Sequence, residues 1–391
     1  MSDRSVDVLI VGGGPAGASC AAELREAGFG GSVLLCGREP DPPYERPPLS
    51  KEYLSSRASR AVPVPDDVEL LTRTSVMRLD PRARTAALST KETVSFDKAV
   101  LCTGANVRRL PIDGSQLEGI HYLRTLRNAD ALREEASGAS RVVLVGGSFI
   151  ACELAATLTT MGVGCAMVFP EERCLSLQFG RRAGSWVQEL LTSHGVEVLA
   201  GDGVERFEGS GEDVERVVTS SGRSLECDLV VVGVGAVPDV MLARSAGLDL
   251  GERGGVRCSA TLEASAPGVF AAGDVCEYDS VVHGGRVRVE HHEVAVGQGR
   301  VAARNVLGEE RPYDDVPYFW SDLADWATLE AVGPAVDGWD DEEVRGSLDD
   351  GAFSVLYSKD GRLVAAMSAG RREDLDEARV RIVTEGRAAQ A

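Results

Sequence analysis

The chain has 391 residues, 43% of them hydrophobic and 26% charged, which is typical of a globular protein with a sizeable buried core. Its formal net charge of −20 argues against binding to nucleic acid or to an anionic membrane surface, because the long-range field repels phosphates. No apolar run approaches the ~20 residues that span a membrane, and the N-terminus shows no basic segment or cleavable apolar stretch. We therefore expect a cytoplasmic protein.

Two residue types are informative by their number. The nine cysteines are scattered and form no CxxC pair, so we expect reduced thiols, with neither a disulfide framework nor a metal site. Only four of the 41 basic residues are lysines, namely Lys51, Lys91, Lys98 and Lys359. A lysine inside a motif is therefore a candidate functional residue.

Short apolar strands that end on glycine alternate with helices over most of the chain. Residues 6–36 predict a strand, a glycine turn, a helix and a second strand, and residues 141–169 repeat that order. The segments 96–105, 228–240 and 268–275 each run as a strand that closes on glycine. This alternation predicts an α/β fold with parallel sheets and two Rossmann-like dinucleotide-binding domains.

The order of these segments also predicts the domain organisation. We expect residues 1–112 and 241–315 to form one domain, into which a second nucleotide-binding domain, residues 113–240, is inserted. Residues 353–370 predict a hairpin with a Lys-Asp-Gly turn, so residues 316–391 are expected to form a small α+β domain. The acidic run 337–351 is expected to be a solvated loop.

The first glycine turn has the spacing GxGxxG. Gly12 permits the tight turn, Gly14 lets a pyrophosphate approach the backbone, and Gly17 lets the helix pack closely with its N-terminus aimed at the phosphates. Glu39 follows about 20 residues later, where a carboxylate can bind a ribose hydroxyl. The alternative is a tight turn without a ligand.

The second glycine turn departs from this pattern. Gly146 opens it, Ala151 takes the third glycine position, and Ser148 stands where a pyrophosphate needs bare backbone, although its hydroxyl could donate to a phosphate oxygen. The next strand ends in Phe169 where an acid that binds NAD is expected. Glu171 and Glu172 would repel a 2′-phosphate, so we expect NADH, with NADPH possible and a degenerate, non-binding domain as the alternative.

The motifs together resemble a known family. In chain order they are "VGGGPAG", "PYERPPLSKEYL", "CTGA", "VVGVGAVP", "AAGDV", "RVEHHEVAVGQGR" and "PYFWSDL". This combination is similar to the oxygenase-coupled ferredoxin reductases, such as putidaredoxin reductase-like and biphenyl-dioxygenase reductase-like flavoproteins. "VEHH" and "FPEE" also resemble apoptosis-inducing factor, which has a Phe-Pro-Glu of this type.

The resemblance implies an FAD domain in two segments, an inserted NAD(P)H domain and a C-terminal domain that covers the flavin. It implies hydride transfer from NAD(P)H to FAD, followed by single electrons to a small iron–sulfur ferredoxin, which serves an oxygenase such as a P450. The expected partner is that ferredoxin, and the chain is expected to be a monomer or a homodimer. Arg286, Arg288, Arg300 and Arg304 could supply a basic face for an acidic ferredoxin.

The resemblance also implies roles for particular residues. Lys51 resembles the lysine near the flavin N5, where a cation stabilises electron density, and Glu153 would approach both Lys51 and the nicotinamide amide. Asp274 would accept from the ribityl hydroxyls, His291 would lie beside the flavin, and Trp320 would cover it. The remaining residues implied in cofactor binding are Pro15, Ala16, Arg46, Thr103, Gly104, Ile150, Gly235, Gly273, Glu290, His292 and Val294.

Several of these residues have plainer interpretations. Lys51 could be an exposed lysine, Glu153 could serve only the helix dipole, and Trp320 could be a core residue. A metal site at the "EHHE" run is disfavoured, since successive side chains point different ways and no distant ligand completes the set.

Three functions remain in competition. The first is the ferredoxin reductase, the second an NADH dehydrogenase or oxidase similar to apoptosis-inducing factor, and the third a flavoenzyme that acts directly on a small molecule. A thiol–disulfide relay is excluded, because "PPYERPPLSKEYL" stands where disulfide reductases need CxxxxC.

Overall fold

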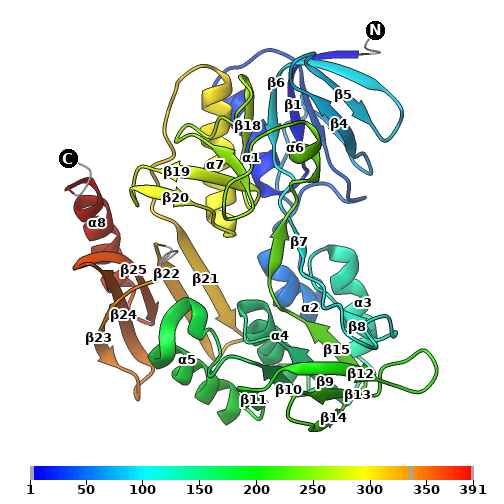
Figure 1. Ribbon diagram of the computed structural model, residues 1–391, viewed down its shortest axis with the longest axis vertical. Helices are drawn as coiled ribbons and strands as arrows, with labels where there is room; N and C mark the ends of the chain where they lie inside the picture. The colour runs from blue at the N-terminus through cyan, green and yellow to red at the C-terminus, as the bar shows by residue number, and fades with distance from the viewer. Residues whose placement is uncertain (1–3, 334–337, 389–391) are drawn as a thin grey trace.

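A computed structural model describes residues 4–333 and 338–388 (Figure 1). Two units built on parallel sheets lie one above the other in Figure 1, and an antiparallel C-terminal sheet lies beside them. No helix of the described segments is long and apolar enough to cross a membrane.

The first unit is a seven-stranded sheet of order β3-β2-β1-β6-β5-β4, with β18 paired to β6. β1, β2, β3, β6 and β18 run parallel, and β4 and β5 form an antiparallel edge. The central strands are buried and apolar, as expected of a sheet covered on both faces. The strands are β1 (Arg4–Val11), β2 (Val33–Cys36), β3 (Glu69–Leu71), β4 (Val76–Asp80), β5 (Thr85–Leu88), β6 (Thr93–Leu101) and β18 (Val269–Ala271).

Helices from both predicted segments pack on this sheet. α1 (Pro15–Glu26) and α7 (His292–Val306) cross so closely that a Cβ on Gly299 would lie 2.3 Å from the Ala16 carbonyl oxygen. The remaining elements of this unit are η1 (Pro47–Ser50), α2 (Glu52–Ser56), α6 (Met241–Ser245) and a small sheet of β17 (Val256–Cys258), β19 (Cys276–Ser280) and β20 (Gly285–Val287).

The second unit is a five-stranded parallel sheet of order β11-β10-β9-β15-β8. The pair β7 (Ala105–Val107) and β16 (Ala236–Pro238) connects it to the first unit. Its strands are β8 (Ile120–His121), β9 (Arg141–Val145), β10 (Gly164–Phe169), β11 (Glu197–Ala200) and β15 (Leu229–Val232). Its other elements are α3 (Leu126–Ala136), α4 (Phe149–Thr160), α5 (Ser176–Ser193), which kinks at Gly180, and the antiparallel β12 (Val204–Glu208), β13 (Arg216–Thr219) and β14 (Ser224–Glu226).

The C-terminal unit is an antiparallel sheet of order β21-β22-β25-β24-β23 covered by α8 (Arg372–Ala388). Its strands are β21 (Tyr318–Leu323), β22 (Ala327–Val332), β23 (Asp341–Ser347), β24 (Ala352–Lys359) and β25 (Arg362–Ala369). The hairpin predicted at 353–370 is β24–β25, and its turn places Asp360 and Gly361 at positive φ.

The prediction that the acidic run is a solvated loop was wrong for about half of its length. Residue 337 lies outside the described residues, but Asp341–Ser347 form the edge strand β23. Its carboxylates are tolerated because an edge strand has one side open to water. Trp339 and Glu342 pack against Gly180 of α5, which joins this sheet to the second unit.

The fold class is as predicted, two Rossmann-like units and a small C-terminal α+β unit. The exact domain boundaries at 112, 240 and 315 stay a prediction.

Candidate active site

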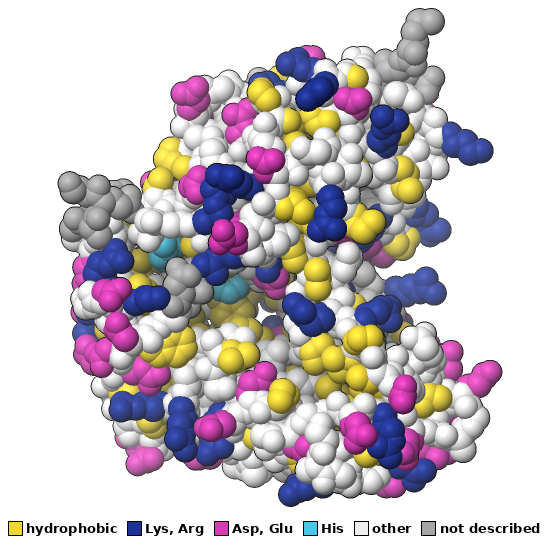
Figure 2. All heavy atoms as spheres, viewed as in Figure 1, with side chains coloured by type: hydrophobic (Ala, Val, Ile, Leu, Met, Phe, Trp, Pro, Cys, Tyr) yellow, Lys and Arg dark blue, Asp and Glu magenta, His cyan; other side chains and the backbone are white. Residues whose placement is uncertain are grey.

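A cleft of about 810 Å³ lies where the three units meet, beyond the carboxyl ends of β1, β6, β9 and β15. This is where open α/β sheets bind ligands. Figure 2 shows the hollow between the upper and lower parts of the molecule. Most predicted site residues line it: Gly12, Gly14, Pro15, Ala16, Glu39, Arg46, Lys51, Thr103, Gly104, Ser148, Ile150, Glu153, Gly235, Gly273, Asp274, Glu290, His291, His292 and Trp320.

Three predicted residues do not line the cleft. A Cβ on Gly17 would lie 2.0 Å from the Gly12 carbonyl oxygen, and one on Gly146 would lie 2.4 Å from the Gly233 carbonyl oxygen. These glycines therefore allow close packing behind the turns. The Val294 side chain is buried in the hydrophobic core of the first unit.

The first glycine turn forms a cradle open to the cleft. Gly12 has φ +124°, and a Cβ there would lie 2.0 Å from the Cys102 carbonyl oxygen. A Cβ on Gly14 would meet nothing within 4 Å, so the space above its backbone is free for a ligand. Gly14 is also the N-cap of α1 and makes no side-chain cap, which leaves N–H groups at a positive helix end. These features fit the pyrophosphate of FAD.

Glu39 is held in a polar cluster at one side of this cradle. Arg46 donates to one carboxylate oxygen at 2.6 Å, and the Tyr44 hydroxyl donates to the other at 2.5 Å. Burial alone would raise the pKa of Glu39, but the Arg46 charge and both hydrogen bonds outweigh it, so the pKa is lowered. Tyr44 stands in the motif "PYERPPLSKEYL", but no role was predicted for it.

Lys51 and Glu153 line the cleft and form a buried ion pair. The Lys51 Nζ lies 2.8 Å from Glu153 Oε1, and only 10% and 6% of the two side chains are exposed. Lys51 follows η1, whose Pro47 and Pro48 fix the backbone, and its Nζ also donates to the Pro47 carbonyl at 3.2 Å. The exposed-lysine interpretation is therefore wrong.

The Ser148 hydroxyl contacts two backbone groups of the protein. As the N-cap of α4 it accepts from the Ala151 N–H at 3.4 Å and donates to the Gly233 carbonyl at 2.7 Å. Its proton is directed to the Gly233 carbonyl, and donation from this hydroxyl to a phosphate oxygen stays a prediction. The serine that replaces glycine at position 148 therefore caps α4 and connects the turn after β9 to the residue that follows β15.

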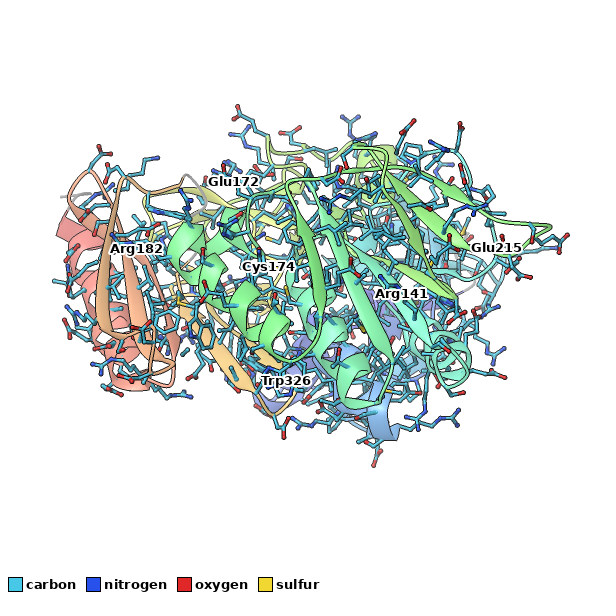
Figure 3. All side chains as sticks on the ribbon, turned by 90° about the horizontal axis from the view of Figure 1, so that it is seen from below. Arg141, Glu172, Cys174, Arg182, Glu215 and Trp326 are labelled. Carbon is cyan, nitrogen blue, oxygen red and sulfur yellow. The ribbon has the colours of Figure 1, made fainter. Side chains whose placement is uncertain are left out.

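Phe169 is buried under the second glycine turn, where its ring would lie 2.9 Å from a Cβ on Gly147. The acidic residues Glu171 and Glu172 come after the end of β10, on the segment between β10 and α5. Figure 3 labels Glu172 on this segment. Glu171 is half-buried and Glu172 exposed. The Arg173 guanidinium is engaged by the Ser185 hydroxyl at 3.0 Å and by the Glu172 carbonyl at 2.6 Å.

Aromatic side chains form one wall of the cleft. Phe149, at the start of α4, lies 4.3 Å from Phe319 of β21 between ring centroids, and Phe319 lies 4.8 Å from His291. Trp320 contacts the His292 ring edge-on and stacks on Tyr318. No role was predicted for Phe149 or Phe319, because an aromatic residue in a strand or helix is usually part of a core.

The N-terminus of α7 closes the cleft. His291 is its N-cap without a side-chain cap, and its Nδ1 is buried with no hydrogen-bond partner in the described protein. Burial lowers the pKa of His291 to about 4, against the opposing charge of Asp274, so the ring is neutral at pH 7. An unpaired polar atom beside a positive helix end fits a polar ring edge such as that of a flavin. Within the described residues, no group of side chains could hold a metal ion.

Asp274 also lines the cleft and pairs with Arg124, whose guanidinium lies 2.7 Å from its carboxylate. No role was predicted for Arg124, because it lies in none of the motifs. Arg124 follows β8 in the second unit, and it reaches the cleft only because that unit packs against the first.

The four arginines expected to form a basic face do not gather as free cations. Arg286 pairs with Asp279 at 2.8 Å, Arg288 with Glu290 at 2.5 Å, and Arg304 with Glu23 at 2.5 Å. These carboxylates neutralise three of the four charges, and Arg300 is exposed.

Comparison with known proteins agrees with this geometry. The sequence pattern described as pyridine nucleotide-disulphide oxidoreductase matches residues 6–299, and that described as reductase C-terminal matches residues 318–391. The chain belongs to the pyridine nucleotide-disulphide oxidoreductase family.

Several members of this family are similar over nearly the whole chain. A ferredoxin–NAD(P)(+) reductase from a Sphingomonas species is 34% identical over 93% of this chain and 90% of its own. The benzene 1,2-dioxygenase system ferredoxin–NAD(+) reductase subunit of Pseudomonas putida is 33% identical over 94% of this chain and 90% of its own. The crystal structure of the ferredoxin reductase for the CYP199A2 system from Rhodopseudomonas palustris superposes with a TM-score of 0.89 at 33% identity, covering 95% of this chain and 92% of that one.

The similarity to apoptosis-inducing factor is also found. Apoptosis-inducing factor 3 of Homo sapiens is 31% identical over 93% of this chain, which covers 61% of the human protein.

The family name includes disulphide chemistry, so the state of the cysteines matters. All nine cysteines are free and buried. Cys36 and Cys102 line the cleft, but burial raises the pKa of Cys36 to about 11 and that of Cys102 to about 12. Since the thiolate is the reactive form, neither side chain is poised for disulfide exchange at pH 7.

Proposed function

We propose that this chain is an FAD-dependent NAD(P)H:ferredoxin oxidoreductase, which takes hydride from a nicotinamide nucleotide and passes single electrons to a ferredoxin that serves an oxygenase. The observation that carries the proposal is the buried Lys51–Glu153 pair, which lies in one cleft with both glycine turns. Two dinucleotide sites that open into one cleft suit transfer between a nicotinamide and a second, enclosed cofactor.

The residues of the first unit would hold FAD. The cradle at Gly12 and Gly14 would bind the pyrophosphate, the Glu39 cluster the adenosine ribose, and Asp274 the ribityl chain. The α7 N-terminus and His291 would face the polar edge of the ring. When bound, FAD accepts a hydride and releases electrons one at a time, which nicotinamide does not do.

Lys51 and Glu153 would act on the charge that develops beside them. The Lys51 ammonium supplies a fixed cation in a buried position, where charge stabilisation is stronger than in water. Glu153 balances that cation and offers an acceptor to the carboxamide of the nicotinamide. Phe149 and Phe319 exclude water from the same space.

We further propose a preference for NADH. Glu171 and Glu172 follow β10, where the adenosine ribose of a nicotinamide nucleotide lies in Rossmann domains, and carboxylates repel a 2′-phosphate. Arg173 is nearby, but its guanidinium is already engaged by Ser185 and by the Glu172 carbonyl.

The test is anaerobic electron transfer by the purified flavoprotein. NADH is added first, then cytochrome c, and finally a [2Fe–2S] ferredoxin, with NADPH in a parallel series. We expect fast cytochrome reduction only after ferredoxin is present. We also expect a higher kcat/KM with NADH than with NADPH. Equal cytochrome reduction without ferredoxin, or no reduction by either nucleotide, would contradict the proposal.

A further inference from the structure

A serine of the C-terminal unit reaches the buried ion pair. The Ser321 hydroxyl of β21 donates to Glu153 Oε1 at 2.6 Å, and Ser321 is fully buried. It comes from an antiparallel sheet 168 residues further along the chain, where its strand neighbour on β22 is Leu329. The C-terminal unit therefore places one hydroxyl group in contact with the Lys51–Glu153 ion pair.

A second serine binds the other side of the same carboxylate. The Ser50 hydroxyl donates to Glu153 Oε2 at 2.5 Å, and Ser50 is 4% exposed. The Thr157 hydroxyl of α4 donates to the Ser50 carbonyl at 2.8 Å, which fixes η1 against the helix that carries Glu153. Segments from all three units thus converge on one carboxylate.

Glu153 accepts from three donors. Lys51 and Ser321 share Oε1, and Ser50 takes Oε2, an arrangement that suits an ionised, acceptor-only carboxylate. Because Oε1 is shared, the Ser321 hydroxyl competes with the Lys51 ammonium for the same negative charge. Removal of Ser321 leaves Lys51 as the partner of Oε1 and ties the ammonium more tightly to the carboxylate.

We infer that Ser321 is a positioning residue, which acts through Glu153 to keep the charge of Lys51 available to the cofactor. The C-terminal unit then does more than cover the cleft, because it sets the strength of the Lys51–Glu153 pair. This inference rests on the proposed function only in assuming that a flavin occupies the cleft. Ser50 differs from Ser321 because it donates to Oε2, the oxygen that Lys51 does not contact.

The first test is Ser321→Ala in the FAD-loaded protein. We expect the midpoint potential of the bound flavin, measured with a chemical reductant, to become more negative, because less positive charge faces the reduced ring. Reduction by NADH should slow about tenfold, which corresponds to about 1.4 kcal/mol. The effect should fall on the reduction rate, with KM for NADH and the FAD content unchanged.

The matched control is Ser368→Ala. Ser368 is also fully buried in the C-terminal sheet, and its hydroxyl donates to the Phe353 carbonyl and accepts from the Arg371 N–H, but it does not line the cleft. It should lower stability as much as Ser321→Ala and leave the potential unchanged. Ser321→Thr, which keeps the hydroxyl, should restore most of the wild-type potential.

A double-mutant cycle tests whether Ser321 acts on the flavin potential through Glu153. If Ser321 works through Glu153, Ser321→Ala should change the potential much less in a Glu153→Gln background than in the wild type. A potential that shifts equally in both backgrounds, or that does not shift in Ser321→Ala, would overturn the inference. Because the potential requires neither NADH nor ferredoxin, these results stand even if the electron-transfer test of the proposed function fails.

Discussion

The Lys51–Glu153 pair shows how a few residues set the chemistry of the cleft. An ion pair in water contributes little, whereas one that is buried and hydrogen-bonded acts strongly on any charge that develops beside it. The proline-rich segment before Lys51 fixes its backbone, and the Glu153 carboxylate fixes its ammonium.

Replacement of Lys51 tests whether its buried positive charge speeds the reduction by NADH. Lys51→Met keeps the length of the side chain and removes the charge, so we expect reduction by NADH to slow about 100-fold, as for the loss of one preorganised electrostatic donor. The measurement is stopped-flow flavin bleaching under anaerobic conditions. Lys98→Met on β6, outside the cleft, is the control, and a Lys51→Met rate within twofold of that control would refute the role of the cation.

Residue-level prediction from sequence succeeded where a motif fixed the position and failed where a distant partner decided the role. The motif around Lys51 placed it in the cleft. The contact of the Ser148 hydroxyl with the Gly233 carbonyl was not predicted, because that carbonyl belongs to a turn 85 residues away. Ser321 stands in the motif "PYFWSDL", but no role was predicted for it, because its partner Glu153 is 168 residues away.

The strand–turn–helix units are the elements that position the cofactors. At each turn a positive-φ glycine packs its backbone against the end of a neighbouring strand, Gly12 on Cys102 and Gly146 on Gly233. Their recurrence was readable from the sequence because glycine spacing and strand hydrophobicity are local. The edge strand β23 was not, because its acidic composition hides a pairing with β24 that only the folded sheet reveals.

Two glycine substitutions separate folding from cofactor binding. Gly14→Val meets no protein atom at Cβ, so we expect a folded protein whose FAD affinity is at least about tenfold weaker. Gly12→Ala would collide with the Cys102 carbonyl at a positive φ and should lower the free energy of unfolding by a few kcal/mol, on the order of the cost of backbone strain. Circular dichroism and flavin content distinguish the two, and a Gly14→Val protein that retains FAD would contradict the cradle.

At the scale of the whole molecule, burial of neutral histidines couples stability to pH. Burial lowers the pKa of His283 to about 4 from 6.5. Between these values the unfolded chain binds a proton that the folded protein does not, so the free energy of unfolding falls as the pH drops from about 6.5 to about 4. His283→Gln should make that dependence shallower in urea denaturation series, and an unchanged slope would show that the ring is protonated in the fold.

The most direct test of the account is an anaerobic titration of the purified protein with NADH. The central claim is that one cleft holds a flavin and a nicotinamide in contact. We predict a yellow protein with about one FAD per chain, whose flavin absorbance is bleached by about one equivalent of NADH. A colourless protein that takes up no FAD, or a bound flavin that NADH leaves oxidised, would contradict it.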